Sequence, residues 1–104
     1  MERTIKSEEF KTIAEQATVL DVRRRADLDA SNEAIPGASW KDPEQIDQWI
    51  GAVPKRDDVV IYCVRGGGVS NSVVDRLQAD GINARYIEGG IEAYKAAGGK
   101  VTAK

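Results

Sequence analysis

Apolar side chains recur along this chain in two patterns, which together predict its secondary structure. Short, nearly continuous apolar stretches rich in β-branched residues are typical of strands covered on both faces of a sheet. Apolar residues spaced three and four positions apart are typical of helices with one buried face. The first pattern predicts strands at residues 18–22, 59–62 and 84–87. The second predicts helices at residues 7–17, 43–50, 69–80 and 91–97.

The order of these elements predicts the fold class. Strands alternate with helices over most of the chain, and this alternation is typical of an α/β fold. We expect three layers, with a mostly parallel central sheet and helices on both of its faces. Ser7 is expected to cap the first helix, and Gly81 to end the third. Residues 23–39 are predicted to form a long surface connection, in which arginines 23–25 form a solvated loop.

Length and composition are those of an ordinary globular domain. The 104 residues suit one domain with one core, so we expect a single domain over residues 1–104. The formal net charge is -2, which gives no overall positive field for nucleic acid or an anionic membrane. No apolar run approaches the roughly 20 residues of a membrane span, and the first ten residues do not resemble a secretory signal. A cytoplasmic location is therefore expected.

The only cysteine of the chain, Cys63, directly follows the predicted strand at residues 59–62. Ligand sites in parallel α/β sheets lie outside the carboxyl ends of the strands. Three successive glycines at positions 66–68 allow the next loop to turn its N–H groups inward, and a helix N-terminus follows them. Such a loop stabilises an anion, and the nearest anion is the thiolate of Cys63 itself. We therefore expect Cys63 to be a nucleophile rather than an inert core residue.

The sequence contains no histidine, which excludes Cys–His and Ser–His–Asp mechanisms within this chain. One cysteine cannot form an internal disulfide, and no Cys/His cluster is present to hold zinc. No metal and no cofactor are predicted. Any activation of the thiol must then come from the loop backbone and the helix that follows it.

The stretch around Cys63 differs from three other kinds of anion-binding loop. A Walker A loop needs Lys followed by Ser or Thr after its last glycine, but here Val69 follows Gly68. A dinucleotide-binding fingerprint starting at Gly66 would need a glycine in place of Asn71. A phosphatase of the Cys-x5-Arg type would need arginine in place of Val69 to clamp a phosphoryl dianion. The loop fits none of these three patterns well.

Four segments of the chain resemble, in their order and spacing, the rhodanese family of single-domain sulfurtransferases. The resemblance extends over about residues 4–101. In the loop at residues 62–69, Cys63 is followed three positions later by Gly66, as in the family's active-site loop. In the Gly-Gly segment at residues 86–94, the family usually carries Trp where Tyr94 stands. The segments are Leu-Asp-Val-Arg at 20–23, Ile-Pro-Gly-Ala at 35–38, the loop at 62–69 and a Gly-Gly segment at 86–94.

This resemblance implies a specific activity. Cys63 would accept a sulfane sulfur from a donor such as thiosulfate, become a persulfide, and pass the sulfur to cyanide or a thiol. Arg65 would help to hold an anionic donor. Asp21 and Arg23 are expected to act as supporting residues, as partners of the loop backbone or of each other. The loop residues implied in binding the substrate or the outer sulfur are Val64, Arg65, Gly66, Gly67, Gly68 and Val69.

Two positions depart from the family pattern. Many members carry Ser, Thr or Arg where Gly68 stands, and histidine where Ala34 stands. We expect a more open pocket, lined from residues near 21–25, 35–40, 63–69 and 88–91, with specificity resting on Arg65 and the backbone.

Besides a small anionic donor and a thiol or cyanide acceptor, a sulfur-relay protein is a candidate partner. The alternative function is a persulfide carrier or redox-sensing module that acts on a protein partner with little turnover on thiosulfate. The intact Cys63 argues against a third interpretation, a catalytically silent interaction domain.

Overall fold

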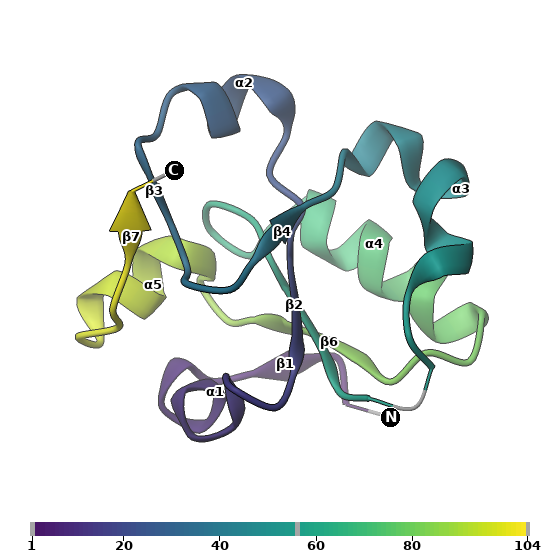
Figure 1. The fold of residues 1–104 in the computed structure, drawn as a ribbon, viewed down its shortest axis with the longest axis horizontal. Coiled ribbons are helices and arrows are strands. Elements are labelled where there is room, and N and C mark those ends of the chain that lie inside the picture. Colours follow the sequence, from purple (N-terminus) through teal and green to yellow (C-terminus); the bar gives the residue numbers. More distant parts are fainter. Residues whose placement is uncertain (1, 56, 104) are drawn as a thin grey trace.

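The computed structural model describes residues 2–55 and 57–103, and a five-stranded sheet forms its centre (Figure 1). The strands lie in the order β1-β6-β5-β2-β4, and each neighbouring pair is parallel. The predicted α/β fold with a mostly parallel central sheet is therefore confirmed. The strands of this sheet are β1 (Thr4–Ile5), β2 (Thr18–Asp21), β4 (Ser39–Trp40), β5 (Val59–Tyr62) and β6 (Ala84–Ile87).

Helices lie on both sides of the sheet, with α1 and α5 on one side and α3 and α4 on the other (Figure 1). Within residues 2–55 and 57–103, none of them is long and apolar enough to cross a membrane. The helices are α1 (Ser7–Ile13), α2 (Arg25–Asp29), α3 (Ile46–Trp49), α4 (Gly68–Ala79) and α5 (Gly90–Ala96), with the 3-10 turns η1 (Pro43–Gln45) and η2 (Ile50–Ala52).

Two apolar clusters hold these layers together, because successive side chains of a strand point to opposite faces of the sheet. Val60 packs on the side of α1 and α5, where the rings of Phe10 and Tyr94 meet edge to face at a centroid distance of 5.7 Å. Ile61 packs on the opposite side, together with Leu77 of α4. All four side chains of β5 are fully buried, as expected of a central strand covered on both faces.

The first helix differs from its prediction at both ends. Lys6, with φ −76° and ψ 152°, is the N-cap residue, and no side chain caps the helix. Ser7 is the first helical residue and is buried, so its predicted role as N-cap was wrong. The helix also ends at Ile13 rather than near residue 17, because the chain turns there through bonds from the Gln16 and Ala17 amides to the Ile13 carbonyl oxygen.

Residues 23–39 are not simply a surface connection. They contain the helix α2, and the strand β3 (Glu33–Ala34) pairs antiparallel with β7 (Thr102–Ala103) outside the main sheet. Arg23 and Ile35 are each only 2% exposed. The prediction of a solvated arginine loop was therefore wrong for Arg23. Strands of two residues carry no periodicity, and a buried arginine looks like a surface residue until its partner is known.

Candidate active site

Cys63 lies where the central strand β5 ends and the loop to α4 begins. β2 and β5 run parallel with Asp21 beside Tyr62, so both strands end at the same edge of the sheet. Cys63 is the next residue after Tyr62 and is 7% exposed. Its loop passes through Gly66, whose φ is +70°, and α4 begins only two residues later at Gly68. The thiol is thus mostly covered and lies between the carboxyl end of a strand and the N-terminus of a helix.

The start of α5 holds the backbone of this loop in place through hydrogen bonds. The amide of Ile91 donates to the Cys63 carbonyl oxygen at 3.0 Å, and the amide of Glu92 donates to the Val64 carbonyl oxygen at 3.2 Å. Gly90 has φ +65°, and a Cβ there would lie 2.4 Å from the Val64 carbonyl oxygen. Contacts this close leave room only for glycine. The Gly-Gly segment therefore fixes the backbone on which the thiol sits, at the same sheet end as Cys63.

Two donors contact the sulfur atom of Cys63. The amide of Gly66 donates to Sγ at 3.2 Å, and the hydroxyl of Ser70 donates to Sγ at 2.9 Å. In the described part of the chain, the amides of Arg65, Gly67 and Val69 donate to no protein acceptor. The expected inward turn of the loop thus brings one backbone amide, rather than several, to Sγ. Arg65, Gly67 and Val69 themselves line the pocket described next.

A pocket of about 370 Å³ opens over Cys63. Arg24 and Arg65 are both exposed, and neither forms an ion pair with another described residue. Asp27 is the carboxylate in the lining, so the two arginines leave the pocket with net positive charge. We call this space the Cys63 pocket; its lining residues are Arg24, Asp27, Cys63, Val64, Arg65, Gly67, Gly68 and Val69.

The lining agrees only in part with the segments that the sequence predicted. Residues 63–69 contribute most of it, and residues 21–25 contribute Arg24. Residues 35–40 and 88–91 do not line it. The second of these segments lies beneath the loop instead, in the contacts described above, and Ile35 is buried in the core with α1 and α5.

Asp21 and Arg23 form a buried ion pair beside the site. Arg23 donates to the Asp21 carboxylate from Nε at 3.0 and 3.1 Å and from Nη2 at 2.7 Å. Nη2 also donates to the Glu33 carbonyl oxygen at 3.0 Å. Burial by itself lowers the pKa of Arg23, but the hydrogen bonds and charge of Asp21 more than offset this, so the pKa is raised. Neither side chain lines the Cys63 pocket, and the supporting role expected of the two residues stays a prediction.

Tyr62 connects this ion pair to the core. The Arg23 guanidinium lies over the Tyr62 ring at 5.6 Å from its centroid, and the Tyr62 hydroxyl accepts a hydrogen bond from the Ile35 amide at 3.2 Å. Burial raises the pKa of Tyr62 well above its ordinary value, and the negative charge of Asp21 adds to the shift. The end of β5 is thereby fixed next to the residue that carries the thiol.

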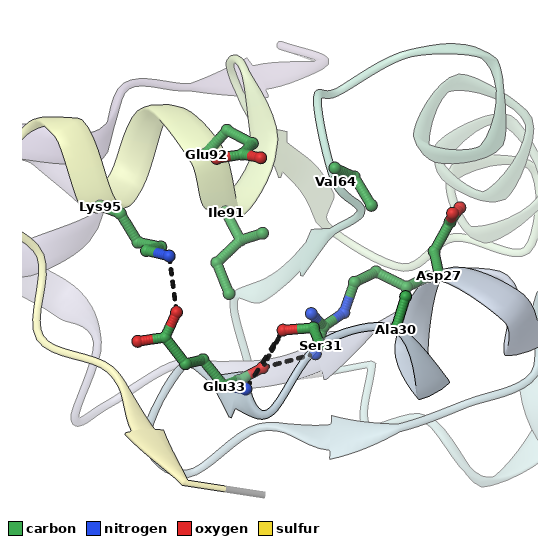
Figure 2. A pocket seen from close by; sticks show the side chains of 9 residues that line it. Asp27, Ala30, Ser31, Glu33, Val64, Ile91, Glu92 and Lys95 are labelled. Atoms are coloured by element: carbon green, nitrogen blue, oxygen red, sulfur yellow. Dashed lines mark hydrogen bonds and ion pairs between the residues drawn. The ribbon is translucent and has the colours of Figure 1, made fainter.

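A second, smaller pocket of about 220 Å³ adjoins the first (Figure 2). It shares Asp27 and Val64 with the Cys63 pocket but does not include Cys63. Figure 2 shows Lys95 of α5 pointing toward Glu33, with which it forms an ion pair at 2.6 Å. Of the described cations that line these two adjoining pockets, Lys95 and Arg23 are paired, whereas Arg24 and Arg65 of the Cys63 pocket form no ion pair.

Two residues of the site were missed by the sequence interpretation, and the role of a third was not singled out. Arg24 fell within the segment near residues 21–25 expected to line the pocket, but it was not named as a cation of the site. Asp27 was not considered, because the helix α2 that carries it was not predicted. Ser70 left a usable signal. It lies on the same helical stripe as the buried Val73, Val74 and Leu77, at spacings of three, four and seven, so it should have been expected to face inward.

The comparisons with known proteins bear on this arrangement. Residues 6–97 match the rhodanese-like domain family. A curated relative, the adenylyltransferase and sulfurtransferase UBA4 of Yarrowia lipolytica, is 33% identical over 98 residues. The match covers 89% of this chain and 24% of that protein, so the chain spans about a quarter of the relative's length.

Solved structures share the fold over nearly the whole chain. A rhodanese-related protein from Thermoplasma volcanium has a TM-score of 0.85 at 23% identity, covering 97% of this chain and 98% of that one. A rhodanese-like domain protein from Staphylococcus aureus has a TM-score of 0.77 at 28% identity, covering 89% and 91%. A Rhodopseudomonas palustris protein of unknown function, described as a possible tyrosine phosphatase, has 0.75 at 22% identity, covering 96% and 84%, which shows the fold alone. With the match over residues 6–97, these findings establish that the chain belongs to the rhodanese-like domain family.

Proposed function

We propose that this protein is a sulfurtransferase that moves a sulfane sulfur from a donor such as thiosulfate to a thiol or cyanide through a persulfide on Cys63. The observation that carries the proposal is the position of the Cys63 sulfur. It accepts hydrogen bonds from Gly66 and Ser70 at the base of a positively charged pocket. Donors to Sγ stabilise a thiolate, which is the nucleophilic form of cysteine.

In the loading step, the Cys63 thiolate attacks the outer sulfur of thiosulfate. A new S–S bond forms to Sγ, the old S–S bond of thiosulfate breaks, and sulfite leaves with the bonding electron pair. The product is a persulfide whose negative charge lies on its outer sulfur. The amides of Arg65, Gly67 and Val69, which have no protein acceptor in the described chain, are the groups that suit this charge. No external oxidant is needed, because thiosulfate supplies sulfur at the required oxidation level.

In the delivery step, the acceptor attacks the outer sulfur of the persulfide. The bond between the two sulfurs breaks, and the electron pair returns to Sγ, which restores the thiolate of Cys63. Cyanide yields thiocyanate, and an acceptor thiolate yields a new persulfide. A compartment that supplies thiols and keeps Cys63 reduced, such as the cytoplasm, suits this chemistry.

Arg24 and Arg65 are proposed to attract the donor. Thiosulfate carries two negative charges. Among the described residues, Arg24 and Arg65 are the cations of the Cys63 pocket that form no ion pair. Charges of one sign at the mouth of a pocket raise the local concentration of the oppositely charged ligand. The curated relative from Yarrowia lipolytica is described as a sulfurtransferase, which supports the same reaction class. A protein that receives or supplies the sulfur remains part of the proposal.

Intact mass spectrometry after incubation with thiosulfate tests the proposal. We expect a gain of about 32 Da, one sulfur atom, which Cys63→Ser abolishes. Addition of cyanide should then release thiocyanate and restore the original mass. Loading without repeated turnover would instead identify a persulfide carrier. If Cys63 stays unmodified with thiosulfate and with other sulfane donors such as polysulfide, both functions are ruled out.

A further inference from the structure

The hydroxyl of Ser70 has an unusual hydrogen-bond partner. Ser70 lies in the first turn of α4, is fully buried, and donates to Sγ of Cys63 at 2.9 Å across seven residues of sequence. A serine inside a helix commonly bonds the carbonyl oxygen four residues earlier or points to solvent. Among the described residues, the sulfur atom of Cys63 is the one hydrogen-bond partner of this hydroxyl. The Ser70 hydroxyl therefore donates its hydrogen bond to Sγ, the atom that would react.

This hydrogen bond distinguishes between the two states of the proposed cycle. When Cys63 is the thiolate, the form that attacks a donor and the form that leaves on delivery, the negative charge lies on Sγ, which is then a strong acceptor. In the persulfide the charge lies on the outer sulfur, and Sγ becomes a neutral and weaker acceptor. Ser70 thus stabilises the thiolate more than it stabilises the persulfide. Because the Ser70 side chain is fully buried, water would not take the place of its hydroxyl if the hydroxyl were removed.

We propose that Ser70 is a catalytic residue that stabilises Sγ as the leaving group when the persulfide delivers its sulfur. During that step the S–S bond breaks and the electron pair moves onto Sγ, where the hydroxyl already points. A donor held in place where charge develops lowers the barrier without reorganisation. The inference rests on the proposed persulfide chemistry and adds to it the group that stabilises Sγ while the S–S bond breaks.

The loading step responds differently to the same hydrogen bond. A hydrogen-bond donor favours a thiolate over its thiol, but it also makes that thiolate less nucleophilic. These two effects oppose each other, whereas in the delivery step the stabilisation acts in one direction only. Loss of the hydroxyl should consequently slow delivery much more than loading. A purely structural role for Ser70 would instead affect both steps alike.

Single-turnover experiments on Ser70→Ala separate the two steps. Loading is followed as sulfite release from thiosulfate, and delivery as thiocyanate release from the isolated persulfide after mixing with cyanide. We expect delivery to slow by about tenfold or more, as for loss of a hydrogen bond to a charged group. Loading should stay within about threefold of wild type. Retained loading also shows that the variant is folded, because that step needs the same loop.

Ser72→Ala is the matched control, since Ser72 is exposed on the same helix. It should leave both steps unchanged. Delivery by Ser70→Ala within about threefold of wild type overturns the role of Ser70 and leaves the proposed function intact. Equal losses in loading and delivery also overturn it, in favour of a structural role. If the wild-type chain forms no persulfide with thiosulfate or polysulfide, the proposed function fails, and this inference fails with it.

Discussion

Gly90 and Val64 lie closer together than any other residue type at position 90 would permit. A Cβ on Gly90 would be 2.4 Å from the Val64 carbonyl oxygen and 2.5 Å from that of Cys63. The same glycine has φ +65°, in the left-handed region that other residues rarely adopt. The start of α5 therefore determines the backbone of the active-site loop, although it does not line the Cys63 pocket.

Gly90→Ala should destabilise the protein by about 3 kcal/mol or more, because strain in the left-handed region and a steric clash add together. Persulfide formation should fall as well, since the loop must shift. Denaturant unfolding measures the first effect, and intact mass after thiosulfate the second. Gly98→Ala is the control: Gly98 has φ +81°, but nothing lies within 4 Å of its Cβ position. Equal losses in the two variants would show that the contact with Val64 is unimportant.

The buried pair of Asp21 and Arg23 should be essential for stability. Arg23→Met removes one partner and leaves the Asp21 carboxylate, which is 3% exposed, without its countercharge. We expect a loss of about 3–5 kcal/mol in the free energy of unfolding, measured with denaturant. Arg25→Met is the matched control, because Arg25 pairs with Asp29 on the surface and should cost less than about 1 kcal/mol. Similar small losses in both variants would contradict a role for the buried pair.

Tyr62 should make stability depend on alkaline pH. Burial raises its pKa in the folded protein above the ordinary value of about 10, so the neutral phenol is favoured by folding. The stabilisation is fully present below about pH 10 and is lost as the pH rises from there toward the folded-state pKa. Unfolding measured at intervals above pH 9 should show a steeper loss for wild type than for Tyr62→Phe. Parallel curves would contradict this assignment. At neutral pH, Tyr62→Phe should cost about 1 kcal/mol, because the Ile35 amide loses its acceptor.

The main layers of the fold could be predicted from the sequence, because their elements are long enough to show periodicity. β5 is uniformly apolar, and α4 has an apolar stripe that ends at Gly81, whose φ is +80°. The strands β1, β3, β4 and β7 have two residues each, so no pattern could reveal them. They form because segments distant in the sequence lie side by side in the folded protein, and no local sequence pattern shows such pairing.

The candidate site was predictable where chemistry and backbone depend on residue type. One cysteine before three glycines indicated the loop, and Asp21 with Arg23 could be expected to pair. The direction of each loop amide was not predictable, since it depends on how α5 packs beneath the loop. The exposure of Arg24 in the pocket was not predictable either, because its two neighbours are the same residue type and behave differently. Arg23 is buried, whereas the Arg25 guanidinium lies over the Trp40 ring at 5.7 Å from its centroid.

The two unpaired arginines of the Cys63 pocket should govern use of anionic donors. Arg65→Ala and Arg24→Ala should each raise the KM for thiosulfate several-fold, because each removes one positive charge from the pocket. The effect should shrink as salt is added, since these side chains are exposed and screened. Delivery from a preformed persulfide to cyanide should change much less, as should the lifetime of the persulfide.

Arg76→Ala is the matched control for this prediction. Arg76 is also an exposed arginine of comparable reach, but it pairs with Asp47 and does not line the Cys63 pocket. Its loss changes the net charge of the protein by the same amount, so a general charge effect would raise the KM in all three variants alike. A rise confined to Arg24→Ala and Arg65→Ala would instead locate donor binding in the pocket. If persulfide lifetime fell together with donor use, the arginines would be holding the bound sulfur rather than attracting the donor.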